Sequence, residues 1–222
     1  MKKVYSIFFL NILFALFCNI TFAQNKNWQI GLKVMPEWGN LNNYPTEIYE
    51  YNYIYTNIIN QNKFIWNIGF QINKQINKSI YLESGIYYTN KAVNVNGIFD
   101  PCPLCFIPIK SSPHSFSRQY SYLNIPLILK FNIKGFYAGS GIGINKYISQ
   151  KADDSQYNTY EINNWVFDLP IVLGYQRKIY SSLNVFLEGR YTPTLSKIYK
   201  NSSEKAVNYG FGFGVNWTLN KK

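Results

Sequence analysis

Two of the three cysteines, Cys102 and Cys105, lie close together in a proline-rich stretch. A Cys-x-x-Cys pair can carry out redox chemistry or supply half of a tetrahedral metal site. The residues that follow show no helical pattern, and His114 is the only histidine that could add a ligand. A local disulfide, which is typical of oxidising compartments, is therefore the preferred interpretation. Free thiols and a redox or metal site are the alternatives.

Three serines, Ser112, Ser115 and Ser117, lie beside His114 in the sequence. A hydroxyl nucleophile and a histidine base could serve a lipid-modifying enzyme if the two groups lay within hydrogen-bond reach. The pattern of the chain places this stretch in a loop, away from the rim of any strand. We therefore expect no enzyme, no catalytic residue and no cofactor or metal. A lipid-modifying barrel enzyme is the least favoured alternative.

A further group of charged residues alternates with apolar residues along the chain. Alternation with a period of two is typical of a β-strand, because successive side chains point to opposite faces. The charged positions that face away from the apolar side chains are Lys33, Glu83, Lys130, Asp168, Glu188 and Arg190. Buried charges persist when they are paired, so this balanced set predicts an ion-pair network inside the protein. The alternative is that some members lie at water-filled ends.

Large apolar side chains recur at every second position in eight segments. These segments are 28–34, 64–72, 80–88, 123–131, 136–144, 165–175, 183–191 and 209–217. Each has room for the roughly 9–11 residues with which a tilted strand crosses a membrane. Their other faces carry mostly Gly, Asn and Tyr, whereas a soluble sandwich would show charged residues to water. Small side chains fit the inside of a narrow barrel, and the apolar faces then point to lipid.

The connections between these segments alternate in length. Short turns are expected near 73–77, 132–135 and 176–182, and long loops near 37–62, 92–118, 147–163 and 193–205. Short periplasmic turns and long external loops are typical of outer-membrane barrels. The sequence therefore predicts an all-β fold, an eight-stranded antiparallel up-and-down transmembrane β-barrel that acts as a monomer. A soluble lipocalin-like barrel is the alternative, but it would not need an apolar outer face.

The first 23 residues have the layout of a secretory signal peptide. Lys2 and Lys3 precede an apolar run, and small residues end the segment before Gln24. We therefore expect a signal peptide over 1–23 and a barrel domain over 24–222 in the outer membrane. The apolar run is shorter than the roughly 20 residues that a spanning helix needs. A single helical anchor and a lipid attached to Cys18 are the alternatives.

The chain is basic, with a formal net charge of +11. In the barrel, basic residues gather at the rim of the short turns: Lys26, Lys74, Lys78, Lys134, Arg177, Lys178, Lys221 and Lys222. There they can pair with phospholipid phosphates, so outer-membrane lipids are an expected partner. A basic, aromatic-rich chain also raises nucleic acid as a partner. We do not expect that partner, because the chain is exported and its aromatic residues follow strand faces.

Several stretches resemble strands of the PorT-like outer-membrane β-barrel proteins. They are residues 122–130, 137–143, 187–191 and 210–214, together with the Ala23-Gln24 junction. The long second loop with its two cysteines departs from that pattern. The resemblance implies the barrel fold and carries over no catalytic residue. It also implies an accessory role in secretion or envelope assembly. Because loops on a rigid scaffold commonly carry binding, we expect the loops to bind an envelope or extracellular protein. A narrow porin-like transport channel is the main alternative.

Overall fold

The computed structural model describes residues 28–42, 48–50, 53–101, 112–152, 161–200 and 203–219. The signal peptide expected over 1–23 lies outside these residues. Cys102 and Cys105 lie outside them too, so their disulfide stays a prediction. No helix in the described ranges combines the length and the apolar character needed to span a membrane.

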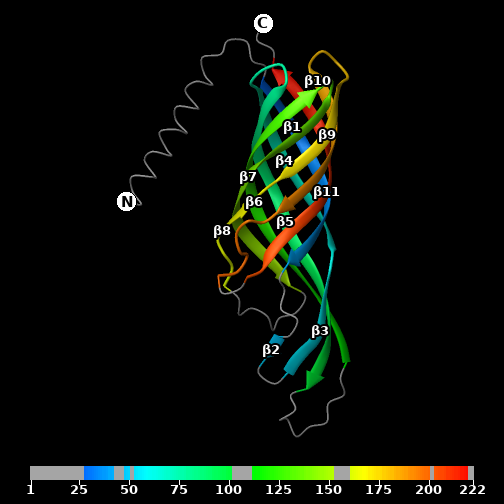
Figure 1. The fold of residues 1–222 in the computed structure, drawn as a ribbon, viewed down its shortest axis with the longest axis vertical. Helices are drawn as coiled ribbons and strands as arrows, with labels where there is room; N and C mark the ends of the chain where they lie inside the picture. Colours follow the sequence, from blue (N-terminus) through cyan, green and yellow to red (C-terminus); the bar gives the residue numbers. More distant parts are fainter. Residues whose placement is uncertain are drawn as a thin grey trace, which may run out of the picture.

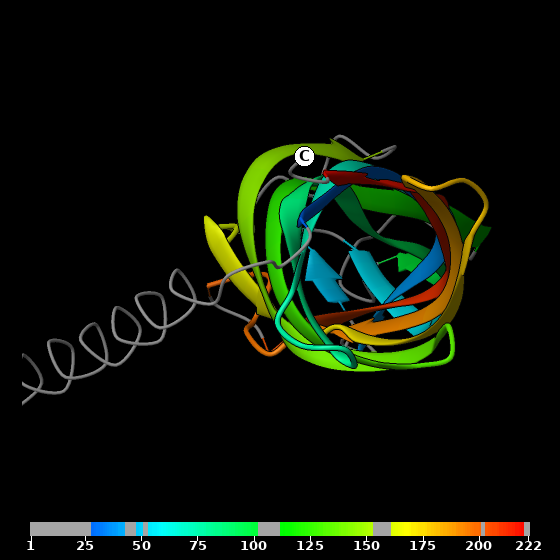
Figure 2. The same ribbon diagram turned by 90° about the horizontal axis from the view of Figure 1, so that it is seen from above.

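The described chain forms one antiparallel sheet of eleven strands. Their bounds are β1 (Trp28–Asn42), β2 (Ile48–Glu50), β3 (Tyr53–Gln61), β4 (Lys63–Gln75), β5 (Ile80–Pro101), β6 (Ser112–Ile133), β7 (Phe136–Ala152), β8 (Trp165–Asp168), β9 (Ile171–Lys178), β10 (Leu183–Pro193) and β11 (Lys205–Leu219). A closed ring is formed by β1, β4, β5, β6, β7, β9, β10 and β11, because β11 pairs back with β1 (Figures 1 and 2). The predicted eight-stranded antiparallel transmembrane β-barrel is therefore confirmed.

One expected strand is interrupted. The segment 165–175 divides into β8 and β9, which both pair with β7. Leu169 and Pro170 separate them. Proline has no backbone N–H to donate to a neighbouring strand, so a ladder breaks where it occurs. β8 and β9 together therefore occupy a single position of the ring.

The two ends of the barrel differ. Trp28 lies opposite both Leu219 and Lys74, so the first and last described residues share one end with the short turns. One of these turns has Lys134 and Gly135 at φ angles of 52° and 95°. Two-residue hairpins of this left-handed type match the twist of the strands that they join. We call this the turn end and the opposite one the loop end.

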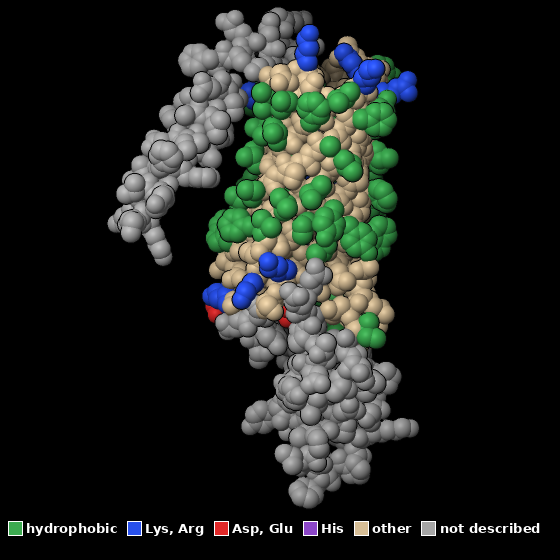
Figure 3. Space-filling view, viewed as in Figure 1, with side chains coloured by type: hydrophobic (Ala, Val, Ile, Leu, Met, Phe, Trp, Pro, Cys, Tyr) green, Lys and Arg blue, Asp and Glu red, His purple; other side chains and the backbone are tan. Residues whose placement is uncertain are grey.

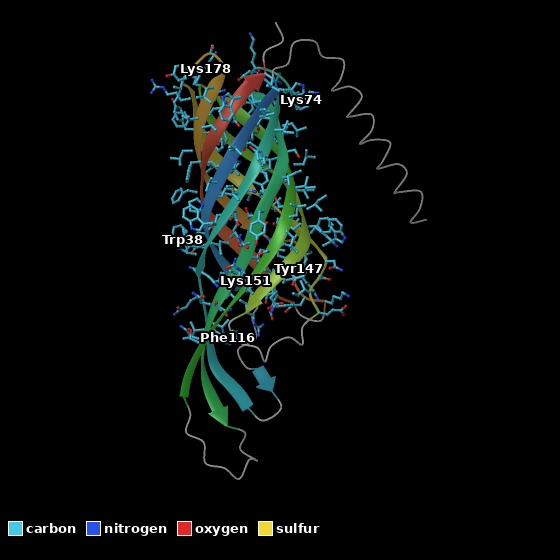
Figure 4. All side chains as sticks on the ribbon, turned by 180° about the vertical axis from the view of Figure 1, so that it is seen from behind. Trp38, Lys74, Phe116, Tyr147, Lys151 and Lys178 are labelled. Carbon is cyan, nitrogen blue, oxygen red and sulfur yellow. The ribbon has the colours of Figure 1, made fainter. Side chains whose placement is uncertain are left out.

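The outer wall carries large apolar side chains. Phe70, Phe136 and Leu173 each expose between 65% and 70% of their surface. Figure 3 shows such side chains across the visible face of the barrel, with Lys and Arg side chains toward both ends of this apolar zone. Figure 4 places Lys74 and Lys178 at the turn end. An outer wall of this kind suits lipid, which confirms the outward faces read from the sequence.

Several strands continue past the ring at the loop end. β5 and β6 stay paired as far as Phe99 and Ser112, β3 pairs with the outer half of β5, and β2 pairs with β3 (Figure 1). We call the parts of these four strands that lie beyond the ring the extension. The loops expected over 37–62 and 92–118 were therefore too long. β1 in fact runs to Asn42, β5 to Pro101 and β6 begins at Ser112.

The polarity of the strands reverses toward the extension. On β5, Val93 is buried inside and Asn94 lies on the outer face. On β6, Phe116 and Ser117 show the same arrangement. Water replaces lipid outside this part, so polar residues face out and apolar residues pack inside, as in a soluble sheet. A pattern of outward apolar residues therefore does not reveal the parts of β5 and β6 that lie in the extension.

The close approach of β7 to β6 generates a first prediction. A Cβ atom on Gly141 would collide with the carbonyl oxygen of Leu127 and lie 2.7 Å from the Ile128 Cα. A Cβ atom on Gly189 would meet nothing closer than 3.8 Å. We expect Gly141→Val to prevent barrel closure and the matched Gly189→Val to permit it. The measurement is gel mobility, since a folded barrel migrates faster unheated than boiled. A fast unheated band for Gly141→Val would contradict the prediction.

Candidate functional site

Two lysines and two glutamates form a closed ring of ion pairs in the middle of the barrel. Lys33 Nζ lies 2.8 Å from Glu83 Oε1 and 2.9 Å from Glu188 Oε1. Lys130 Nζ lies 2.6 Å from Glu83 Oε2 and 3.1 Å from Glu188 Oε2. Each lysine thus bridges both carboxylates. We call these four residues the central ring, and they join β1, β5, β6 and β10 across the lumen.

Strand alternation positions the central ring. Each of its four residues directly follows a leucine that takes the outward direction. Tyr137 fills the adjacent space and donates its hydroxyl to Glu188 Oε2 over 2.9 Å, while Lys130 Nζ lies 4.3 Å from the centre of the Tyr137 ring. Gly212 leaves room, because a Cβ atom there would lie 2.9 Å from Glu188 Cγ. The ring is therefore both paired and closely packed.

A second ion-pair cluster lies nearer to the loop end. Lys91 Nζ donates to both carboxylate oxygens of Asp168 over 2.9 Å. Arg190 lies between the two clusters. Its Nη1 is 3.8 Å from Glu188 Oε1, and its Nε is 3.8 Å from Glu37 Oε1. Arg190 therefore links Glu37 to the central ring, whereas Lys91 and Asp168 form a separate pair.

Amide side chains complete the second cluster. Asn145 donates to Asp168 over 2.8 Å. Asn67 and Asn208 donate to Glu37 Oε2 over 2.6 and 3.3 Å. Hydrogen bonds to a buried carboxylate replace the water that it loses on burial. The asparagines of the inward faces therefore supply hydrogen bonds to the buried carboxylates of Asp168 and Glu37.

All six charged residues singled out by the sequence point into the lumen and are buried. Five of them meet in or beside the central ring, whereas Asp168 pairs with Lys91 instead. The sequence reading missed Glu37 and Lys91 because it ended the first and third strands too early. Period-two alternation continued from Lys33 and from Glu83 would have pointed to both.

Side chains also fill the lumen beyond the ion pairs. Toward the turn end, Gln71 Nε2 donates to Asn216 Oδ1 over 2.5 Å, and Asn73 reaches the same oxygen over 3.4 Å. A cavity of about 10 Å³ lies in this layer, and one of about 20 Å³ lies beside the second ion-pair cluster. A water molecule needs roughly 10–15 Å³ measured in this way. Each cavity therefore has room for about one water.

An apolar cluster closes the loop end of the lumen, and we call it the loop-end plug. Its members are Leu41, Val93, Val95, Phe116, Tyr120, Tyr122, Val166, Ile198, Tyr199 and Ala206. The hydroxyls of Tyr120 and Tyr199 share a hydrogen bond, and their rings meet edge to face at 5.7 Å. Arg118 is buried among these residues. Burial raises the pKa of nearby Glu204 to about 7, although Arg118 acts in the opposite direction.

Two of the three serines considered as nucleophiles, Ser115 and Ser117, have other partners. His114 lies on β6 and not in the loop that the sequence predicted. Ser115 Oγ donates to Asn96 Oδ1 over 2.7 Å, and Ser117 Oγ accepts from Lys63 Nζ over 2.9 Å. Among the described residues, no three His, Cys, Asp or Glu side chains gather closely enough to hold a metal ion.

The central ring generates a second prediction. Glu188→Ala would leave Lys33 and Lys130 with only Glu83 between them. Breaking a buried ion pair costs roughly 3–5 kcal/mol, so we expect clearly lower thermal stability in detergent micelles. Leu187→Ala is the matched control. Leu187 precedes Glu188 but its side chain faces outward, so detergent or lipid can fill the space that the shorter side chain leaves. Equal melting temperatures for the two variants would show that the lumen charges are solvated.

Solved structures of outer-membrane proteins resemble this chain at low identity. The crystal structure of OprG from Pseudomonas aeruginosa is 9% identical, with coverage of 88% of this chain and 96% of that chain and a TM-score of 0.45. The solid-state NMR structure of AlkL in DMPC lipid bilayers is 12% identical, with coverage of 89% and 92% and a TM-score of 0.48. The crystal structure of neisserial surface protein A is 8% identical, with coverage of 88% and 100% and a TM-score of 0.47.

The family comparison is more decisive. No curated protein matches the sequence. A family model described as an outer membrane protein beta-barrel domain matches residues 22–200, which is most of the chain. The closed ring of strands, the apolar outer wall and the charged lumen agree with that match. The chain therefore belongs to the family of outer membrane protein beta-barrel domains and is an integral protein of the outer membrane.

Proposed function

We propose that the chain is a non-enzymatic, closed barrel that holds a protein-binding surface outside the outer membrane. The observation that carries this proposal is the filled lumen, with ion pairs at its centre and the loop-end plug above them. A barrel occupied by its own side chains acts through what it presents at its ends. The resemblance to PorT-like proteins supports an accessory role in secretion or envelope assembly.

In this proposal the turn end faces the periplasm. Outer-membrane barrels have short periplasmic turns and longer external loops. The connections at 76–79, 134–135 and 179–182 are short, whereas the extension lies at the other end. The extension then projects from the cell surface.

The extension is suited to binding because it is a paired sheet. β5 and β6 remain in register from Val93 and Arg118 out to Phe99 and Ser112. The hydrogen bond from Ser115 to Asn96 links the same two strands on the outer face. Loops on a rigid scaffold are the usual carriers of binding function, because the scaffold fixes their ends. The segments joined to this sheet are thus the proposed contact surface for an envelope or extracellular protein.

Two observations argue against the alternatives. A porin-like channel needs a continuous wet path, but ion pairs cross the lumen and the loop-end plug packs its loop end, and the cavities beside these side chains measure about 10 and 20 Å³. A lipid-modifying enzyme needs a serine activated by a base. Ser115 and Ser117 instead bind Asn96 and Lys63. The binding role accounts for the filled lumen and the long paired strands together.

Site-specific photo-crosslinking in intact cells tests this function. We expect a crosslinking amino acid at Ser115 or at Asn96 to capture the same discrete protein, because both lie on the outer face of the extension. Lys178 at the turn end is the matched control and should not capture it. Adducts are identified by mass spectrometry. Capture of that protein at Lys178 alone would contradict the orientation, and no shared adduct at Ser115 and Asn96 would contradict the binding role.

A further inference from the structure

The outer wall of the barrel contains an apolar groove that extends from β6 to β11. Its volume is about 580 Å³, and it is open to the surroundings. The lining includes Phe131, Phe136, Leu173, Leu187 and Phe211. We propose that this groove binds one acyl chain of a phospholipid whose phosphate is held by basic residues of the turn end.

The groove arises from strand register. One row across the sheet pairs Phe131 with Ala138, Ala138 with Leu173, Leu173 with Gly189, and Gly189 with Phe211. Large and small side chains therefore alternate along the row. A Cβ atom added to Gly189 would meet nothing within 3.8 Å. The hollow at this glycine is a feature of the wall and is not filled by the protein.

The neighbouring row lines the groove on the side of the turn end. Phe136 pairs with Tyr175, and Tyr175 pairs with Leu187. The rings of Phe136 and Tyr175 pack with centroids 4.8 Å apart. These large side chains rise beside the hollow at Gly189. An acyl chain that lies in the hollow therefore contacts apolar side chains beneath it and beside it. A flat part of the barrel surface offers contact on one side only.

Basic residues lie where the groove meets the turn end. Lys134 follows the groove residue Ile133, and Arg177 lies two positions beyond the groove residue Tyr175. The turn between β6 and β7 is tied to β9, because Gln176 N donates to Gly135 O over 2.8 Å. Lys134 and Arg177 therefore come from segments that are fixed beside each other. Both are exposed and free to reach a phosphate.

This arrangement fits an amphipathic lipid better than an apolar compound. The groove is apolar, and cations at its end match an anionic phosphodiester. The orientation proposed above places the turn end in the periplasm, so the ligand is a phospholipid of the inner leaflet. Only the choice of leaflet depends on that orientation. The groove and its basic end do not depend on it.

Native mass spectrometry of the full-length mature protein tests the inference. The protein is purified in mild detergent and supplied with phosphatidylglycerol or phosphatidylethanolamine. We expect the wild type to retain one phospholipid. Gly189→Phe should lose it by filling the hollow, whereas Ile86→Phe, on the outer face of β5, should keep it. Unheated gel mobility checks that each variant is folded.

A charge variant separates the parts of the site. Lys134→Gln combined with Arg177→Gln leaves the groove intact and should weaken retention. The proposal would be overturned if the wild type retained no phospholipid, or if folded Gly189→Phe retained as much as the wild type. Retention of lipopolysaccharide in place of phospholipid would also overturn it, because that lipid belongs to the other leaflet. The two proposals share only the orientation of the barrel. Capture of a protein at Ser115 does not require lipid retention, so the binding role and the lipid site can fail separately.

Discussion

The rest of the structure depends on the pairing of charges inside the barrel. Below the loop-end plug, the buried charges of the lumen include four cations and four anions: Lys33, Lys91, Lys130, Arg190, Glu37, Glu83, Asp168 and Glu188. Their surroundings are packed with other side chains, and a single unpaired buried charge is strongly destabilising. Each charge therefore needs its partner at the right height on another strand. The central ring joins β1, β5, β6 and β10, so it favours only the register in which the barrel closes.

The same strands meet three surroundings along their length. In the membrane-facing part, apolar side chains point to lipid, and charges and amides are buried inside. Toward the loop end, Val93 and Phe116 turn the apolar side inward, and the loop-end plug forms a core like that of a soluble protein. This reversal gives the extension its own stability in water. The long β5 and β6 strands thus connect the part held by lipid to the part proposed to meet a partner.

Much of this fold could be predicted from the sequence, because strand alternation records which face meets lipid. The eight segments, the short turns and the inward direction of Lys33 or Glu188 all follow from it. Where lipid gave way to water the rule reversed, so the extension was missed. Glu37 and Lys91 were missed because the first and third strands were ended too early. Partner choice was also out of reach, as Asp168 shows, since it depends on the relative height of strands far apart in sequence. The groove at Gly189 has the same origin, because it appears only when four strand pairings are aligned.

The central claim is that the lumen is closed by its own side chains. Conductance of the purified wild-type protein in planar lipid bilayers tests this claim most directly. The account predicts no steady current steps, because ion pairs and the loop-end plug occupy the path that ions would take. Steady steps with a reproducible ion selectivity that changes in Glu188→Gln would contradict it. That result would mean that water surrounds the lumen charges and that the barrel acts as a channel.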